Sequence, residues 1–395
     1  MKKFLLILIL IFSTSLNAKT FKEVLHLYEF QIKTYLKKHN IESVSQITPV
    51  NIDKTLKSGF WPNHWPFAVG ISDNKAFWVT FKRLGMVEIN PIINKNFNQL
   101  SAINGTKDGQ IIIADNKENK LHIIQLDKML SNYTIKQTIQ TPSPKSIKIN
   151  KNNTLAVLGD NSISIYNRFK KSYKLNKEFS KKLAEKISKK SIQAINYDSK
   201  NNLYVLVDNK IHIYNKVAEK IKTITLDKNI NAFGITYHKN IIGISSKDNM
   251  LYTFSKNGNL LHKKQFPKFK NNNNVKFTFF PPFAYVGLYS NLEGYAYNMG
   301  LDIIDFRWLK KIERNKKEFS FTSTFPAKMT ISISDQNNKP ILTIIDNKIL
   351  TAKKHTFKFT LPQNDSAKSY TLSISGKALY SQSNTKTKII EFKNK

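Results

Sequence analysis

Apolar residues along this chain come in short runs, which alternate with polar residues and are separated by polar turns. Residues 108–127 show the pattern clearly: an apolar run at 111–114 leads into Asp115-Asn116, and a second run follows at 121–126. Short β-branched runs on both sides of a polar turn predict the two strands of a hairpin. The same pattern returns in residues 154–167, 202–215 and 240–258.

These hairpins repeat at a regular spacing. The Asp-Asn pairs begin at positions 115, 160, 208 and 248, in steps of 45, 48 and 40 residues. An all-strand repeat of this length is typical of a propeller blade, and blades must close into a ring to cover their apolar faces. We therefore predict an all-β fold with a six-bladed β-propeller over residues 67–309. The predicted blades are 67–93, 97–140, 144–179, 191–227, 230–266 and 275–309, with a Lys-rich helical insertion at 180–190.

One of the repeats resembles the NHL type. Gly109 precedes a strand that ends in Ala114-Asp115, and a polar turn with Asn119 and then a basic residue follow, which is the order in that family's repeat. Residues 202–215 match the pattern less fully. The resemblance implies a propeller, usually of six blades, and implies no particular activity.

The residues before the repeats carry two further signals. Residues 1–18 have a basic start, an apolar core and a small-residue site at Ala18, so we expect a signal peptide that is cleaved near Ala18 and directs the chain to the periplasm. An uncleaved N-terminal anchor is the alternative. Residues 19–66 should hold a basic amphipathic helix at 20–40 and an aromatic lead-in segment.

The residues after the repeats predict a second domain. Residues 310–317 form a charged linker, and residues 318–395 contain alternating strands separated by turns. We predict an immunoglobulin-like β-sandwich, without that fold's cysteine pair. Residues 339–345, 355–359 and 369–374 resemble strands of the sandwich in flagellar hook-capping proteins.

The sequence offers few groups for chemistry. The chain has no cysteine, which excludes disulfides, thiolate metal sites and a cysteine nucleophile. Its eight histidines form no HxH or HExxH pair, and GxSxG, P-loop and GxGxxG motifs are missing. Carboxylates of the Asp-Asn turns could suit Ca²⁺, but tight hairpins need the same residues. His122 and His212 occupy equivalent positions and are expected to point outward. We predict no catalytic residue, no cofactor and no metal.

The charge bears on the choice of partner. A net charge of +36 favours acidic proteins or acidic envelope polymers, although a composition rich in Lys, Asn and Ile also produces such a charge without a dedicated site. Arginine, which binds phosphates and bases through two hydrogen bonds, is scarce, and export would separate the chain from nucleic acid, so we expect no nucleic-acid partner. The candidate partner-binding residues are aromatic or basic: Trp61, Trp65, Tyr289, Tyr295, Lys181, Lys182, Lys189 and Lys190.

The function expected from these features is a non-enzymatic interaction or assembly module in the cell envelope, without a transmembrane anchor after cleavage. Two alternatives stay open. The chain could be a propeller that binds or processes an envelope glycan through its central channel, or an accessory factor for a periplasmic redox enzyme.

Overall fold

The computed structural model describes the strands, the turns between most of them and one helix. The described residues are 46–50, 67–72, 75–82, 86–91, 97–106, 108–126, 132–187, 191–236, 239–266, 275–280, 285–290, 293–309, 316–362, 369–379 and 385–393. The predicted signal peptide and amphipathic helix lie outside these residues, as do Trp61, Trp65, Lys189 and Lys190. No helix within the described ranges is long and apolar enough to cross a membrane.

Consecutive strands form a series of antiparallel sheets up to residue 298. The first sheet holds β1 (Gln46–Val50), β2 (Phe67–Ser72), β3 (Lys75–Lys82) and β4 (Met86–Pro91). The second holds β5 (Leu100–Gly105), β6 (Gln110–Asp115), β7 (Lys120–Leu126) and β8 (Tyr133–Gln140). The third holds β9 (Ser146–Ile149), β10 (Leu155–Leu158), β11 (Ile163–Phe169) and β12 (Ser172–Leu175).

The series continues with the same order of strands. The fourth sheet holds β13 (Ile192–Tyr197), β14 (Leu203–Val207), β15 (Lys210–Tyr214) and β16 (Lys220–Thr225). The fifth holds β17 (Ala232–Ile235), β18 (Ile241–Ser245), β19 (Met250–Phe254) and β20 (Leu260–Gln265). A three-stranded sheet follows, with β21 (Lys276–Phe280), β22 (Tyr285–Ser290) and β23 (Glu293–Asn298).

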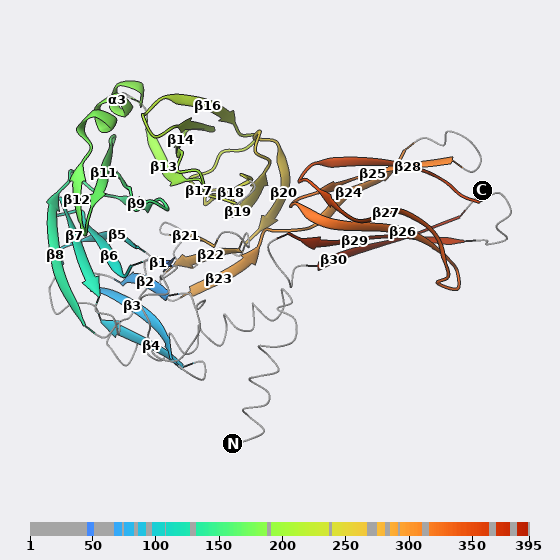
Figure 1. Ribbon diagram of the computed structural model, residues 1–395, viewed down its shortest axis with the longest axis horizontal. Coiled ribbons are helices and arrows are strands. Elements are labelled where there is room, and N and C mark those ends of the chain that lie inside the picture. Colours follow the sequence, from blue (N-terminus) through green and yellow to red (C-terminus); the bar gives the residue numbers. More distant parts are fainter. Residues whose placement is uncertain are drawn as a thin grey trace, which may run out of the picture.

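The first strands of these sheets meet around a ring. β1 contacts β5, β5 contacts β9, and the series continues through β13 and β17 to β21, which contacts β1 again. The sheets fan outward from this ring (Figure 1). Sequential four-stranded antiparallel sheets around a common centre are the architecture of a β-propeller, as the repeats predicted.

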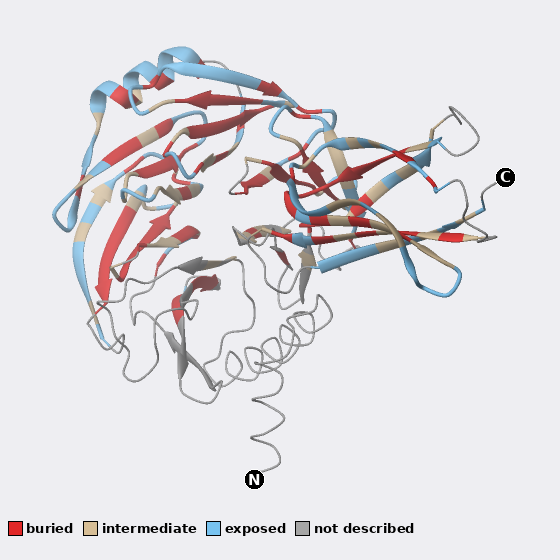
Figure 2. Ribbon diagram, turned by 45° about the vertical axis from the view of Figure 1, so that its right-hand side comes forward, coloured by how far each residue is buried: buried red, intermediate tan, exposed pale blue. Residues whose placement is uncertain are grey.

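Burial explains why the repeats fold in this way. β6, β10, β14 and β18 are buried along their whole length, because both faces of a propeller sheet are covered by neighbouring sheets. The outer strands are largely exposed, as in β16, and Figure 2 shows this gradient from buried to exposed residues. The single described helix, α3 (Lys177–Ile187), follows β12 and buries Phe179, Leu183 and Ile187 against the core.

The C-terminal strands form two more sheets. One contains β24 (Ile303–Trp308), β25 (Lys316–Ser323) and β28 (Lys354–Thr360). The other contains β26 (Ala327–Asp335), β27 (Pro340–Leu350), β29 (Tyr370–Ala378) and β30 (Thr385–Phe392). Phe319 and Phe321 of the first sheet pack with Met329 and Ile331 of the second, so the two sheets share a core.

Two strands pair differently from the prediction. β1 lies in the segment predicted as a lead-in, but it pairs with β2 and joins the first sheet. β24 was predicted as the last propeller strand, but it pairs with β25. The reason for the second difference is aromatic packing, since the Trp308 ring lies 4.9 Å from the ring of Phe392.

One hydrophobic core joins the propeller to the C-terminal sheets. It runs from Ile242 and Ile244 of β18 through Val286 and Leu288 of β22 and reaches Phe319. Met299 and Leu301 lie within the same cluster, along the connection between the two parts. We therefore expect the described strands to behave as one rigid body.

Candidate functional site

The four predicted partner-binding residues that the structure describes occupy two separate places. Lys181 and Lys182 lie exposed on α3, where Lys182 forms an ion pair of 2.7 Å with Glu178. Tyr289 lies in β22 and Tyr295 in β23, strands that pair with each other. Figure 1 places α3 beside β11 and well away from β22 and β23, so these residues do not form one site.

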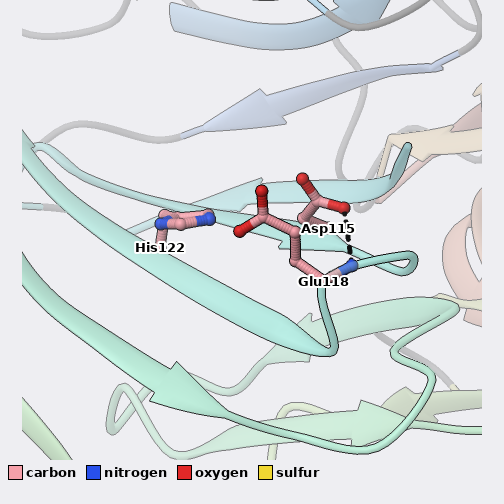
Figure 3. A group of neighbouring side chains, drawn as sticks. All are labelled: Asp115, Glu118 and His122. Carbon is pink, nitrogen blue, oxygen red and sulfur yellow. Dashed lines mark hydrogen bonds between the residues drawn. The ribbon is translucent and has the colours of Figure 1, made fainter. Parts of the chain in front are cut away.

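A group of two carboxylates and one histidine lies at the β6–β7 hairpin (Figure 3). Asp115 ends β6, Glu118 lies in the turn and His122 lies in β7, with one ligand atom of each within 4.8 Å of the others. Asp115 is fully buried and His122 is 1% exposed. The prediction that His122 points outward is therefore wrong, and His212, at 8% exposed, is buried as well.

The hydrogen bonds of Asp115 and Glu118 show that the group has a structural role. Oδ2 of Asp115 accepts from the backbone N–H of Asn98 (2.9 Å), and Oδ1 accepts from Gln99 and Glu118 (3.2 Å each). Glu118 accepts from the Asn98 side chain (2.7 Å) and from Lys120 (2.9 Å). The group thus ties the hairpin to the residues that lead into β5. Its donor types suit a divalent cation, but the Asp115 carboxylate already serves three backbone groups.

Replacing Asp115 by alanine should therefore destabilise the fold. Three backbone N–H groups, in hydrogen bonds that are partly buried, would lose a charged acceptor, and we expect the free energy of unfolding to fall by about 2 kcal/mol. Denaturant unfolding followed by circular dichroism measures the change. Asp160→Ala is the matched control, because Asp160 is exposed in the equivalent Asp-Asn turn and should change stability by no more than about 0.5 kcal/mol. Equal losses in the two variants would contradict this role.

A second polar group joins the second and third sheets. Arg168 of β11 forms a two-bond ion pair with Asp108, in which Nη1 lies 2.8 Å from Oδ1 and Nη2 contacts Oδ2. Gln137 and the backbone of Tyr173 exchange two hydrogen bonds, of 2.9 and 2.8 Å. Burial raises the pKa of Tyr173 to about 12, so its hydroxyl stays protonated.

The Asp108 pair predicts a pH effect. Burial opposes ionisation of Asp108, but hydrogen bonds from Arg168 and Thr106 outweigh it and hold the pKa below the ordinary value of 3.8. The depressed pKa means that Asp108 stabilises the fold above pH 3.8 and loses this contribution as the pH falls through the folded-state value. Since Asp108 is partly exposed, we expect Asp108→Asn to cost about 1 kcal/mol at pH 7. Unfolding curves at pH 7 and pH 3 should show this difference shrinking in acid, and a constant difference would contradict it.

The first strands of the ring carry no Asp or Glu in any of the segments that the structure describes. Their charged residues are Lys148 of β9 and Lys276 of β21.

The C-terminal sheets form a pocket of about 220 Å³, which the sequence did not predict. Its walls include Trp308 of β24 and Phe392 of β30, at the edges of the two sheets. Lys317 lies over the Phe392 ring at 5.8 Å, while Glu318 and Lys393 add further polar groups. Trp308 could not be identified as a pocket residue from sequence, because its edge position depends on the pairing of β24 with β25.

Comparisons with known proteins agree with the fold class alone. No family model matches the sequence, and no curated protein matches it. Among solved structures, virginiamycin B lyase from Staphylococcus aureus aligns at 12% identity and a TM-score of 0.41, covering 57% of this chain and 73% of that one. Hydrazine synthase from Kuenenia stuttgartiensis aligns at 10% identity and a TM-score of 0.37, covering 72% and 78%. Similarity this low does not extend to activity.

Proposed function

We propose that the chain is an exported, non-enzymatic β-propeller that acts as an interaction or assembly module in the cell envelope. The observation that carries the proposal is the hydrophobic cluster from Ile242 to Phe319, which joins the fifth and sixth sheets of the propeller to the C-terminal sheets. A rigid body with two differently shaped parts suits a protein that holds other components in fixed positions.

The finer architecture is part of the same proposal. Each sheet from β1 to β23 would be one blade, which gives six blades of the NHL type, the last with three strands. The two C-terminal sheets would form the immunoglobulin-like sandwich. The signal-like residues 1–18 support export to the periplasm with cleavage near Ala18.

The high positive charge supports an acidic partner, either an envelope protein or an acidic envelope polymer. Affinity isolation of the tagged mature chain from envelope extract, at low and at high salt, tests the proposal. We expect one protein in stoichiometric amount at low salt and much less of it at high salt, because salt screens exposed charges. Recovery that is equal at both salt concentrations would overturn the electrostatic part, and recovery of no protein would overturn the proposal.

One observation favours glycan binding as a second candidate. The pocket at Trp308 and Phe392 combines aromatic rings with lysine donors and a glutamate acceptor, a combination that suits a sugar ring. Recovery of glycan without protein in the same isolation would favour this function, and Trp308→Ala should then abolish the recovery.

A further inference from the structure

Asparagine side chains connect neighbouring first strands of the ring at equivalent positions. Asn104 of β5 donates through Nδ2 to the carbonyl of Ile147 in β9 (3.2 Å). Asn196 of β13 donates in the same way to the carbonyl of Phe233 in β17 (3.1 Å). Each side-chain oxygen accepts from the next backbone N–H of its own strand, at 2.8 and 2.9 Å. Both asparagines thus lie in the same local geometry.

Lys148 of β9 occupies this same position in the strand between them. Asn104, Lys148 and Asn196 each lie two positions before a turn, and one backbone hydrogen bond closes each turn. The N–H groups of these bonds belong to Thr106, Asn150 and Asp198, and the carbonyls belong to Gln110, Thr154 and Asn202. Each of the three residues also pairs with the second strand of its sheet, opposite Ile112, Ala156 and Tyr204 respectively. The ring therefore carries an ammonium group where its neighbours carry an amide.

The surroundings of Lys148 give its charge no compensation among the described residues. Burial lowers the pKa of Lys148, and no acidic group raises it. The residue still keeps part of its surface accessible. No Asp or Glu occurs on the first strands as far as the structure describes them. A charge in such surroundings is stabilised by a counter-charge.

We propose that Lys148 is the cationic group of an oxyanion-binding site at the centre of the ring. The ligand class is a small molecule or group with a phosphate or carboxylate. Asn104 and Asn196 hold the equivalent positions on the two strands beside β9. The Asn104 amide reaches the carbonyl of Ile147, next to Lys148, whereas the Asn196 amide bonds to Phe233 of β17, and each amide nitrogen keeps a second N–H group. The Lys148 ammonium provides the charge that an oxyanion needs, and the second N–H group of the Asn104 amide provides a hydrogen-bond donor beside it. The proposed anion site is separate from the proposed function, so it can be tested without knowing which protein the chain binds.

Titration calorimetry with inorganic phosphate and with acetate tests the site, at constant ionic strength held with chloride. The variants are Lys148→Met, which keeps the length of the side chain without its charge, and Lys148→Arg, which keeps the charge. Lys174→Met is the matched control, because Lys174 lies exposed on the outer strand β12. We expect saturable binding of one of the two anions to the wild type and to Lys174→Met, and at least tenfold weaker binding to Lys148→Met.

The thermal unfolding midpoint provides an independent readout, since a ligand that binds the folded state raises it. The bound anion should raise the midpoint of the wild type and of Lys148→Arg but not that of Lys148→Met. If Lys148→Met does not fold, Lys148→Gln takes its place, because glutamine also removes the charge but keeps a polar side chain, and this variant should lose saturable binding while Lys148→Arg keeps it. Non-saturable binding to the wild type, or equal binding to Lys148→Met, would overturn the proposal.

Discussion

Replacing Phe319 by alanine should lower the free energy of unfolding by about 4 kcal/mol, as is usual when a large ring is removed from a core. Phe319 has no exposed surface and lies where the aromatic groups of the C-terminal sheets converge. Its ring centroid is 5.7 Å from Phe306, 5.8 Å from Trp308 and 5.7 Å from Phe357. The cavity left by the substitution would lie between β24, β25 and β28.

Guanidinium unfolding followed by tryptophan fluorescence and circular dichroism measures this loss. Phe169→Ala is the matched control, because Phe169 is 61% exposed at the end of β11 and should change stability by no more than about 0.5 kcal/mol. A loss below about 1 kcal/mol in Phe319→Ala would show that the aromatic cluster does not hold the C-terminal sheets together.

Replacing Thr324 by valine should cost about 3 kcal/mol without any change in side-chain shape. The Thr324 hydroxyl is fully buried, accepts from the backbone N–H of Asp302 (2.7 Å) and donates to the carbonyl of Gly300 (2.6 Å). The Thr324 carbonyl accepts from the side chain of Asn240, at 3.4 Å, across the junction with the propeller. Loss of the hydroxyl would remove this partner from the buried carbonyl of Gly300 and from the partly buried N–H of Asp302, at the point where the two parts meet.

The matched control is Thr356→Val on β28, where the hydroxyl is exposed and stability should change by no more than about 0.5 kcal/mol. Amide hydrogen exchange gives the location of the effect. Faster exchange in Thr324→Val should appear on both sides of the junction. Faster exchange in the C-terminal strands alone would contradict the shared core.

The sequence predicted the propeller because its second strands are continuous apolar runs between polar turns, as β6 and β14 show. It missed β1 because this short strand contains Pro49, which lacks a backbone donor, and because its partner β2 begins only at Phe67. It also misplaced β24, since Ile303 and the rings that follow fit a propeller strand as well as a sandwich strand. Contacts of Trp308 with Phe319 and Phe392 decide that β24 joins the C-terminal sheet and not the propeller.

The candidate sites were less predictable, for a physical reason. Asp115 was expected to serve the hairpin, and its backbone hydrogen bonds fit that expectation. The burial of His122 was missed because alternation along a strand identifies one covered face, whereas both faces of β7 are covered. The position of Lys148 beside Asn104 and Asn196 depends on the order of first strands around the ring, which no local pattern contains.

Differential scanning calorimetry of the mature chain most directly tests the central claim, that the hydrophobic cluster shared by the last propeller sheets and the C-terminal sheets couples the two parts into one unit. We predict one cooperative transition whose calorimetric and van't Hoff enthalpies agree, and a lower midpoint for the whole transition in Thr324→Val. Two separated transitions, with the C-terminal sheets unfolding independently of the propeller, would contradict the account.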